Sequence, residues 1–268
     1  MTTQDLYGRI LRKHSMLCVG LDTDYAKLPP HLRTGHPAED VLAFNKAIVD
    51  ATAPYCVAFK PNLAFYECLG PEGLRVLGET VEYIRLQHPD QFLIADAKRG
   101  DIGNTARMYA KSLFETFDFD AVTLSPYMGS ETVAPFLDYP GRFAIVVALS
   151  SNPSAADFQF AGQDGKPLYR VVMEKMMAIS TPENMMFVVG ATKADKLMEI
   201  RRFCPDNFFL VPGGGAQGGS AREVMAAGAN DRGGLLINSS RGVLYASSGE
   251  DFAAAAAAAA RSLAFLLS

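Results

Sequence analysis

The sequence has few of the residue patterns that form disulfide frameworks, zinc sites or histidine-based active sites. Its four cysteines are scattered, form no C-x-x-C pair and have no histidine beside them, so neither a disulfide framework nor a zinc site is expected. Four histidines are present, but no H-E-x-x-H motif occurs. The sequence therefore predicts no metal site, argues against histidine catalysis and fits a reducing cytoplasm.

An excess of basic residues and long apolar runs are also lacking. The formal net charge is -4 and the pI is about 5.6, whereas binding to a nucleic-acid backbone normally requires a basic face. No apolar stretch reaches the length of a membrane-spanning helix, and the alanine run at 253–260 is short and favours an ordinary helix. We therefore expect neither nucleic acid nor a membrane as a partner, and any bound phosphate to be small.

The sequence does contain a series of short apolar runs that alternate with amphipathic stretches. The eight runs lie at 16–21, 55–59, 92–95, 121–124, 143–149, 185–189, 208–211 and 234–237. Helices long enough to connect parallel strands are predicted between them, for example at 38–51, 71–86, 104–117 and 191–203. Eight such units predict one α/β domain over residues 1–268, a (β/α)8 TIM barrel. The alternative is a doubly wound sheet, which would need a reversal of strand order that a sequence alone does not reveal.

Polar residues follow almost every predicted strand. The catalytic groups of a TIM barrel lie where its strands end, so these residues are candidates for a site. They are Asp22, Lys60, Asp96, Lys98, Ser125, Ser150, Ser151, Asn152 and the segments 213–217 and 238–241. The longest segment without a predicted element, 150–167, also begins at a strand end, and loops longer than about 12 to 15 residues are usually functional or disordered. We expect this segment to face the substrate.

The densest group of charges is the segment from Asp96 to Asp101. Alternation along an extended chain would place Asp96 and Lys98 on the same side, in the mouth of the barrel. Lys60 closes another apolar run, and a lysine among carboxylates stays protonated because nearby opposite charge favours its charged form. Such a lysine suits a proton donor, whereas a Schiff-base lysine must be neutral. For Asp101 alone, which follows a glycine and precedes a predicted helix, a helix N-cap is the preferred interpretation.

A second group consists of the glycine-rich segment 212–219 and Arg241. Loops after the seventh and eighth strands form the usual phosphate site of this barrel. Glycines let backbone N–H groups approach an oxyanion, and an arginine at a helix start can bind phosphate oxygens in a bidentate manner. The two features together predict a phosphate site.

These residues carry a resemblance to a known family. The motif D-x-K-x-x-D-I-x-N-T, present as Asp96, Lys98, Asp101, Ile102, Asn104 and Thr105, is similar to the signature of orotidine 5′-monophosphate decarboxylases. The segments 59–62, 151–153 and 212–219 and the pair Ser240-Arg241 also match that family, and the Ser-Asn-Pro turn resembles its longer bacterial branch. Gly214 departs from the pattern, since an aliphatic residue would be more familiar there.

The resemblance implies a role for each matching residue. Lys98 would protonate C6 of the pyrimidine after carbon dioxide leaves, and Asp96 would lie against the departing carboxylate. The other implied contacts are Lys60, Asp22 and Asn62 with the ribose, Ser151 with the pyrimidine edge, and Gln217, Arg241, Gly215 and Gly218 with the phosphate. Asp101 and Thr105 would reach the site of a second subunit, so the resemblance implies a homodimer with shared active sites, without metal or cofactor.

Two alternative functions remain open. A metal-assisted sugar-phosphate decarboxylase or aldolase of the same barrel superfamily is similar in its D-x-K-x-x-D motif, but would place an acidic metal ligand where Lys60 stands. A non-catalytic phosphate-binding barrel would retain Arg241 and the glycine-rich loop, and would leave Asp96, Lys98 and Lys60 without a purpose.

Overall fold

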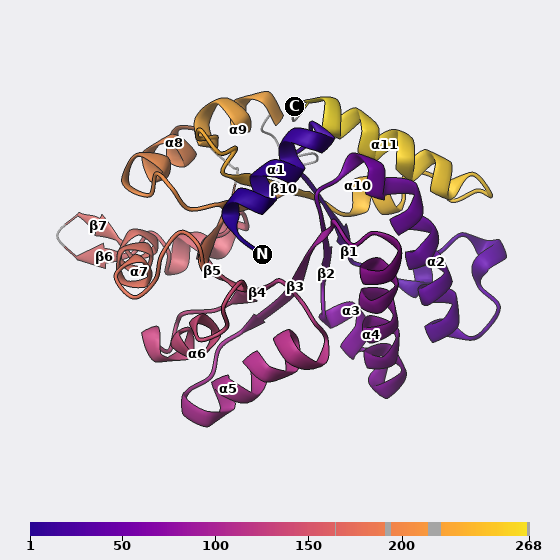
Figure 1. Ribbon diagram of the computed structural model, residues 1–268, viewed down its shortest axis with the longest axis horizontal. Helices are drawn as coiled ribbons and strands as arrows, with labels where there is room; N and C mark the ends of the chain where they lie inside the picture. Colours follow the sequence, from indigo (N-terminus) through magenta and orange to yellow (C-terminus); the bar gives the residue numbers. More distant parts are fainter. Residues whose placement is uncertain (164, 191–193, 214–220, 267–268) are drawn as a thin grey trace.

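The computed structural model describes residues 1–163, 165–190, 194–213 and 221–266. At its centre eight parallel strands close into a barrel in the order β1-β10-β9-β8-β5-β4-β3-β2, with helices around the outside (Figure 1). The strands are β1 (Leu17–Leu21), β2 (Ala58–Pro61), β3 (Phe92–Arg99), β4 (Ala121–Leu124), β5 (Phe143–Leu149), β8 (Met185–Val189), β9 (Phe209–Pro212) and β10 (Leu235–Ser239). The predicted TIM barrel is confirmed, and each of the eight apolar runs contains or overlaps one of these strands.

The predicted helices are confirmed where the structure describes them. The α-helices are α1 (Thr3–Lys13), α2 (Pro37–Thr52), α3 (Ala64–Glu67), α4 (Gly70–Gln87), α5 (Gly103–Lys111), α6 (Ala134–Leu137), α7 (Leu168–Met177), α8 (Ala194–Phe203), α9 (Ala221–Gly228), α10 (Arg241–Leu244) and α11 (Phe252–Leu266). The stretch predicted at 104–117 divides into α5 and a π-helical turn, Ser112–Thr116. The start of the helix predicted at 191–203 lies outside the described residues. The alanine run belongs to α11, where Ala256 and Ala260, four residues apart, are buried.

The strands are apolar because the barrel covers them on both faces. All five residues of β1 and of β8 are buried, as expected for parallel strands that have side chains inside the barrel and helices outside it. Helix α1 lies across one end of the barrel (Figure 1) and buries Leu6 and Ile10. This end is the amino-terminal one, so the carboxyl ends of the strands are left at the opposite end.

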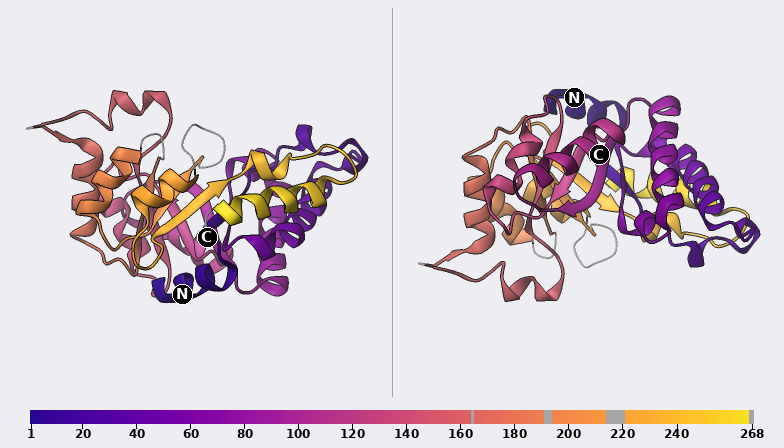
Figure 2. Two further views of the ribbon diagram at one scale, coloured as in Figure 1. Left: turned by 90° about the horizontal axis from the view of Figure 1, so that it is seen from above. Right: turned by 90° about the horizontal axis from the view of Figure 1, so that it is seen from below.

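The segment 150–167 differs from the prediction of an irregular loop. It contains a 3-10 helix, Pro153–Asp157, and an antiparallel pair of two-residue strands, β6 (Gly162–Gln163) and β7 (Lys166–Pro167). Figure 2 shows that this segment projects away from the barrel. Gln159 ties it back to the end of β5, because its side chain accepts a hydrogen bond from Ser150 N at 2.7 Å and donates one to Ser150 Oγ at 2.8 Å.

None of the helices in the described ranges has both the length and the apolar content that a membrane crossing requires.

Candidate active site

A cavity of about 260 Å³ opens at the carboxyl ends of the strands. It is lined by Asp22, Lys60, Asp96, Lys98, Thr123, Val147, Ser150, Ser151, Asn152, Val188, Leu210, Pro212 and Asn238. Five of the residues with a predicted role, Asp22, Lys60, Asp96, Lys98 and Ser151, therefore lie around one cavity together with the strand-end candidates Ser150 and Asn152. The sequence separates Asp22 from Ser151 by more than a hundred positions. The barrel brings them together because its parallel strands all end on the same face.

Asp96 is the central charge of the cavity. Its Oδ2 lies 2.8 Å from Lys60 Nζ and its Oδ1 lies 2.5 Å from Lys98 Nζ, while Thr123 Oγ1 donates a hydrogen bond to Oδ1 at 3.0 Å. Burial alone would raise the pKa of Asp96, but the two ammonium groups outweigh it and lower the pKa to about 2. The carboxylate is therefore charged throughout the physiological range.

Lys60 lies deep in the cavity, between two carboxylates. Only 5% of its side chain is exposed, and its Nζ is 3.8 Å from Asp22 Oδ1 on the side opposite Asp96. Burial disfavours the ammonium, yet the Asp96 and Asp22 carboxylates raise the pKa of Lys60 above its usual value. Burial also raises the pKa of the neighbouring Cys18 thiol to about 12, so that thiol adds no charge.

Asp96 and Lys98 contact each other, but not through the strand alternation that the sequence predicted. The pairing of β3 with β4 shifts register, so that Ala95 pairs with Val122 and Arg99 with Leu124. Four steps along β3 thus match two steps along β4, as in a β-bulge. Lys98 has a φ of 45° in this bulge, and 55% of its side chain is exposed. The bulge directs the Lys98 ammonium back onto Asp96 and into the cavity.

The end of β5 supplies the polar side chains on another part of the wall. Ser150 Oγ donates to Asn152 Oδ1 at 2.6 Å, and Gln159 holds Ser150 from the projecting segment. Gly190 follows β8 and passes close to Ser151, because a Cβ at Gly190 would lie 2.8 Å from Ser151 N. The backbones of Gly190 and Ser151 therefore lie close together, and a side chain at position 190 would collide with Ser151.

The structure describes two residues of the predicted phosphate site, Gly213 and Arg241. Arg241 begins α10 and is exposed, in agreement with its predicted place at a helix start. Gly213 has a φ of 76°, a conformation that glycine adopts without strain. The predicted phosphate-loop residues Gln217, Gly215 and Gly218, like Gly214, lie outside the described residues.

Asn238 is a cavity residue that the role assignments from the sequence missed. It is buried, its Nδ2 donates to Ser240 Oγ at 3.2 Å, and its Oδ1 has no hydrogen-bond partner among the described residues. Gly20 on β1 makes room for these two side chains, because a Cβ there would lie 1.9 Å from Ser240 Oγ. The signal available in the sequence was the place of Asn238 in the polar segment 238–241.

Three other predicted residues lie outside the residues that line the cavity. Asn62 turns the chain after β2, because its Oδ1 accepts from Ala64 N at 3.2 Å, and it forms a bridge with Asp96. Asp101 is half-buried and Thr105 exposed. The N-cap interpretation of Asp101 is wrong: α5 begins at Gly103 with Ile102 in the cap position, and Asp101 Oδ1 accepts instead from Ile102 N.

A buried polar network supports the end of β1. Asn45 on α2 accepts from Thr23 Oγ1 at 2.6 Å and donates to Tyr66 Oη at 3.0 Å and Thr80 Oγ1 at 3.2 Å. Tyr66 Oη in turn donates to Leu21 O at 3.2 Å. The network joins three helices to the end of β1, directly before Asp22.

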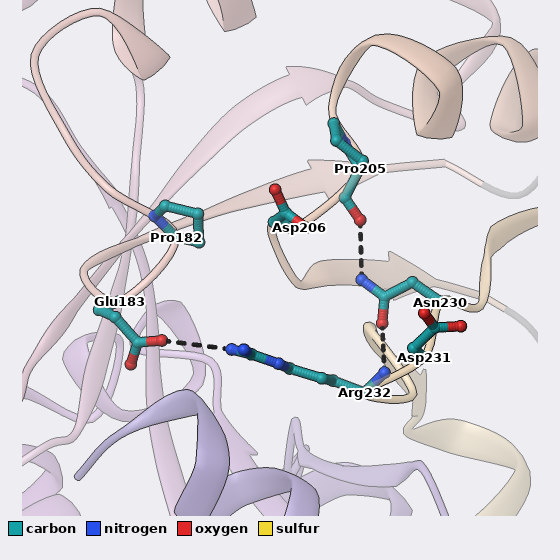
Figure 3. Close-up of a pocket in the computed structure, with 7 residues that line it drawn as sticks. All are labelled: Pro182, Glu183, Pro205, Asp206, Asn230, Asp231 and Arg232. Atoms are coloured by element: carbon teal, nitrogen blue, oxygen red, sulfur yellow. Dashed lines mark hydrogen bonds and ion pairs between the residues drawn. The ribbon is translucent and has the colours of Figure 1, made fainter.

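A larger hollow, of about 570 Å³, lies at the opposite end of the barrel. Figure 3 shows its lining, which comes from the loops that precede β8, β9 and β10. Its contacts join these loops: Arg232 Nη1 is 3.7 Å from Glu183 Oε1, and Asn230 Nδ2 donates to Pro205 O at 2.8 Å. Such contacts at the amino-terminal end of a TIM barrel serve stability, whereas catalytic groups belong to the other end.

The part of the chain that the structure describes lacks a cluster of metal ligands. It holds no group of three or more His, Cys, Asp or Glu side chains arranged to bind a metal ion. In the cavity, the position between Asp22 and Asp96 is taken by the Lys60 ammonium.

Comparisons with known proteins identify the family to which the sequence is similar. Residues 15–258 match the model of the orotidine 5′-phosphate decarboxylase / HUMPS family. The chain is 53% identical over 245 residues to the orotidine 5′-phosphate decarboxylase of Porphyromonas gingivalis, covering 91% of this chain and 88% of that protein. It is 52% identical over 244 residues to that of Christiangramia forsetii, covering 91% and 89%.

Solved structures of the same family also match this chain over nearly its whole length. The OMP decarboxylase of Leishmania donovani superposes with a TM-score of 0.82 at 34% identity, covering 99% of each chain. The UMP synthase of Leishmania donovani matches with a TM-score of 0.81 at 36% identity, covering 97% of this chain and 56% of the longer one.

Proposed function

The chain belongs to the orotidine 5′-phosphate decarboxylase / HUMPS family, and from this membership we propose how it converts orotidine 5′-monophosphate to uridine 5′-monophosphate, the final step of de novo UMP synthesis. The enzyme is a carboxy-lyase. The observation that carries the proposal is the contact of Lys98 and Lys60 with Asp96 in a cavity at the carboxyl ends of the strands.

In the proposed mechanism the bond between C6 and the carboxylate carbon breaks, and its electron pair stays on C6 as carbon dioxide leaves. The Lys98 ammonium then gives a proton to C6 and regains one from solvent. Lys98 suits this role because it lines the cavity and its Nζ lies 2.5 Å from Asp96 Oδ1, the carboxylate proposed to face the departing group. Asp96 lies against the substrate carboxylate, which departs as a neutral molecule.

Electrostatics between Asp96 and the substrate carboxylate supplies only part of the acceleration. Two charges about 4 Å apart interact by roughly 4 kcal/mol at an effective dielectric constant of about 20, whereas enzymes lower barriers by about 8 to 23 kcal/mol. The rest comes from stabilisation of the carbanion beside Lys98 and from binding energy of the remote phosphate, which holds the ring in place.

We propose the remaining binding roles from the resemblance to the family. Asp22 and Lys60 hold ribose hydroxyls, with Asn62 beside them, and Ser151 contacts the pyrimidine edge. Arg241, Gln217 and the glycine-rich loop bind the phosphate. The Oδ1 of Asp22 supports this role: it is buried and accepts no hydrogen bond among the described residues, although Lys60 Nζ lies 3.8 Å away. A buried acceptor of this kind favours a ligand donor.

We propose that the reaction needs neither metal nor cofactor. The Lys60 ammonium lies where a divalent ion would have to contact both Asp22 and Asp96, and a positive charge there repels such an ion. This arrangement disfavours the metal-assisted sugar-phosphate decarboxylase or aldolase. Full activity after treatment with EDTA is expected, and its abolition would favour the metal-assisted alternative.

We also propose a homodimer with shared sites. Four large apolar side chains are exposed in this region: Ile102 directly before α5, Met108 on α5, and Tyr127 and Met128 after β4. The residues that follow, Ser130–Thr132 and α6, contact α5. Exposed apolar side chains gathered on one part of a surface mark interaction sites. Asp101 and Thr105 lie within the same region, where they can reach the cavity of a partner subunit.

We propose that the chain acts as one catalytic domain in the cytoplasm. A continuous buried core from Leu6 to Ala260 supports the single domain. The four cysteines, all free thiols, support a location in the reducing cytoplasm.

The decisive test follows the ultraviolet absorbance change as orotidine 5′-monophosphate is consumed, with wild type and Lys98→Ala side by side. Turnover by the wild type, and its loss in Lys98→Ala with the affinity for uridine 5′-monophosphate retained, are the expected results. Binding of the nucleotide without turnover by the wild type would favour a non-catalytic phosphate-binding barrel. Equal loss of affinity and turnover in the variant would assign Lys98 to binding.

A further inference from the structure

The hydroxyl of Thr123 connects the two groups to which the proposed mechanism assigns the chemistry. Thr123 lies in β4 and is 1% exposed. Its Oγ1 accepts a hydrogen bond from the backbone N–H of Lys98 at 3.0 Å, and it lies 3.0 Å from Asp96 Oδ1. The hydroxyl carries one proton, and the charged carboxylate is a nearer acceptor than Ala95 O at 3.5 Å. The Thr123 hydroxyl thus accepts a hydrogen bond from the Lys98 backbone and donates one to the Asp96 carboxylate.

The register of the sheet explains why a side chain is needed at this place. Between the pairs Ala95–Val122 and Arg99–Leu124, the three residues from Asp96 to Lys98 face the single residue Thr123. Backbone ladder bonds cannot serve all three, since a bulged residue is left out of the pairing. The Thr123 hydroxyl takes the place of the missing acceptor for Lys98 N, and beyond it Ser125 N closes the bulge with a bond to Arg99 O at 2.7 Å.

The conformation of Lys98 depends on this contact. A φ of 45° is uncommon for a residue other than glycine and persists only when its surroundings fix it. More than half of the Lys98 side chain is exposed, so packing restrains it little. Its position is determined by the backbone bond to Thr123 and by the contact with Asp96, which Thr123 also holds.

We propose that Thr123 is a positioning residue for the decarboxylation: its hydroxyl fixes the bulge of β3 so that the Lys98 ammonium and the Asp96 carboxylate face the reacting carbon in one geometry. This inference rests on the proposed roles of Lys98 and Asp96. A purely structural role is the alternative, since threonine is a common strand residue whatever its contacts. The two differ in whether the loss of the hydroxyl affects turnover beyond stability and binding.

The test compares Thr123→Val, which keeps the shape and removes the hydroxyl, with Thr123→Ser, which keeps the hydroxyl. Misplacement of a catalytic group by about 1 Å can lower a rate about a hundredfold, so kcat of Thr123→Val is expected to fall by about that factor. Its affinity for uridine 5′-monophosphate is expected to stay near that of the wild type. Thr123→Ser should recover most of kcat.

The control is Thr52→Val, which removes a buried hydroxyl that donates to Ile48 O within α2, away from the cavity, and is expected to leave kcat unchanged. Thr123→Ala lacks the hydroxyl as well and replaces Thr123→Val if the latter does not fold. The inference is overturned if Thr123→Val keeps the wild-type kcat, if kcat and nucleotide affinity fall together, or if Thr123→Ser is as slow as Thr123→Val. Wild-type turnover by Lys98→Ala would instead contradict the proposed function itself.

Discussion

Lys60 Nζ lies 2.8 Å from Asp96 Oδ2, and only 5% and 10% of the two side chains are exposed. A buried ion pair gains little net stability, because the loss of hydration offsets the attraction. In the proposed mechanism, its value is that the two charges are in place before a substrate arrives, so no reorganisation is required during the reaction. The stability of the substrate-free protein should therefore fall strongly when either partner of the pair is removed.

Lys60→Ala is expected to destabilise the free protein strongly. Removing one partner of a buried pair typically costs about 3 to 5 kcal/mol, since an uncompensated charge stays behind. Here two carboxylates, Asp96 and Asp22, would face each other without the ammonium. The matched control is Lys196→Ala, which breaks an exposed pair with Glu199 and should cost less than about 1 kcal/mol. Urea unfolding measures both, and equal effects would contradict a buried role for Lys60.

Acid should weaken the contribution of Asp96 to stability. Its pKa in the folded protein is about 2, against about 3.9 in an unfolded chain, so its stabilisation is present above about pH 4 and is lost as the pH falls towards 2. The free energy of unfolding of the wild type minus that of Asp96→Asn should therefore decrease as the pH is lowered from 5 towards 2. Urea titrations at several pH values measure this difference. A difference that does not change with pH would mean that Asp96 has an ordinary pKa.

Arg241→Ala should weaken the binding of phosphorylated ligands selectively. A hydrogen bond to a charged group contributes about 1.5 to 3 kcal/mol, which corresponds to roughly a 10- to 150-fold loss of affinity for uridine 5′-monophosphate. The affinity for uridine, which has no phosphate, should not change. Arg261→Ala, at an exposed position of α11, is the control for removing a positive charge. Unchanged nucleotide affinity in Arg241→Ala would refute the phosphate site.

The barrel could be predicted because each strand is buried on both faces. Such strands appear in the sequence as uninterrupted apolar runs, and polar residues begin where a strand leaves the core, as Asp22 does after Leu21. The hairpin of β6 and β7 was missed because strands of two residues are too short to show alternation. The far end of β3 was missed because three of its last four residues, Asp96, Lys98 and Arg99, are charged and end the apolar run.

The contacts within the site depend on pairings that a sequence does not contain. Thr123 stands in the run 121–124 and looks like any β-branched strand residue. Only the register of β3 against β4 shows that it faces the bulge and bonds Lys98 and Asp96. Individual site residues could be proposed from motif and position, whereas the geometry that joins them required the fold.

The last prediction concerns the sharing of each active site between two chains. Asp101 lies past the end of β3, outside the residues that line the cavity of its own chain, and next to the exposed Ile102. In a dimer with two-fold symmetry, a residue of one chain that enters the partner's site has its counterpart in the other site. Lys98→Ala and Asp101→Ala should each be inactive alone, the first lacking the proton donor of every site and the second lacking the contribution of the partner.

Mixing the two variants should restore activity. In a mixed dimer one site takes both substitutions and the other takes neither, so random exchange of subunits gives about half mixed dimers and about a quarter of intact sites. Exchange is verified by co-purification of differently tagged chains, and the decarboxylation rate of the mixture is compared with that of each variant alone. A mixture of Lys98→Ala with a differently tagged Lys98→Ala is the control, because none of its sites is intact. If exchange is complete and no activity returns, Asp101 acts within its own chain and the shared site is refuted.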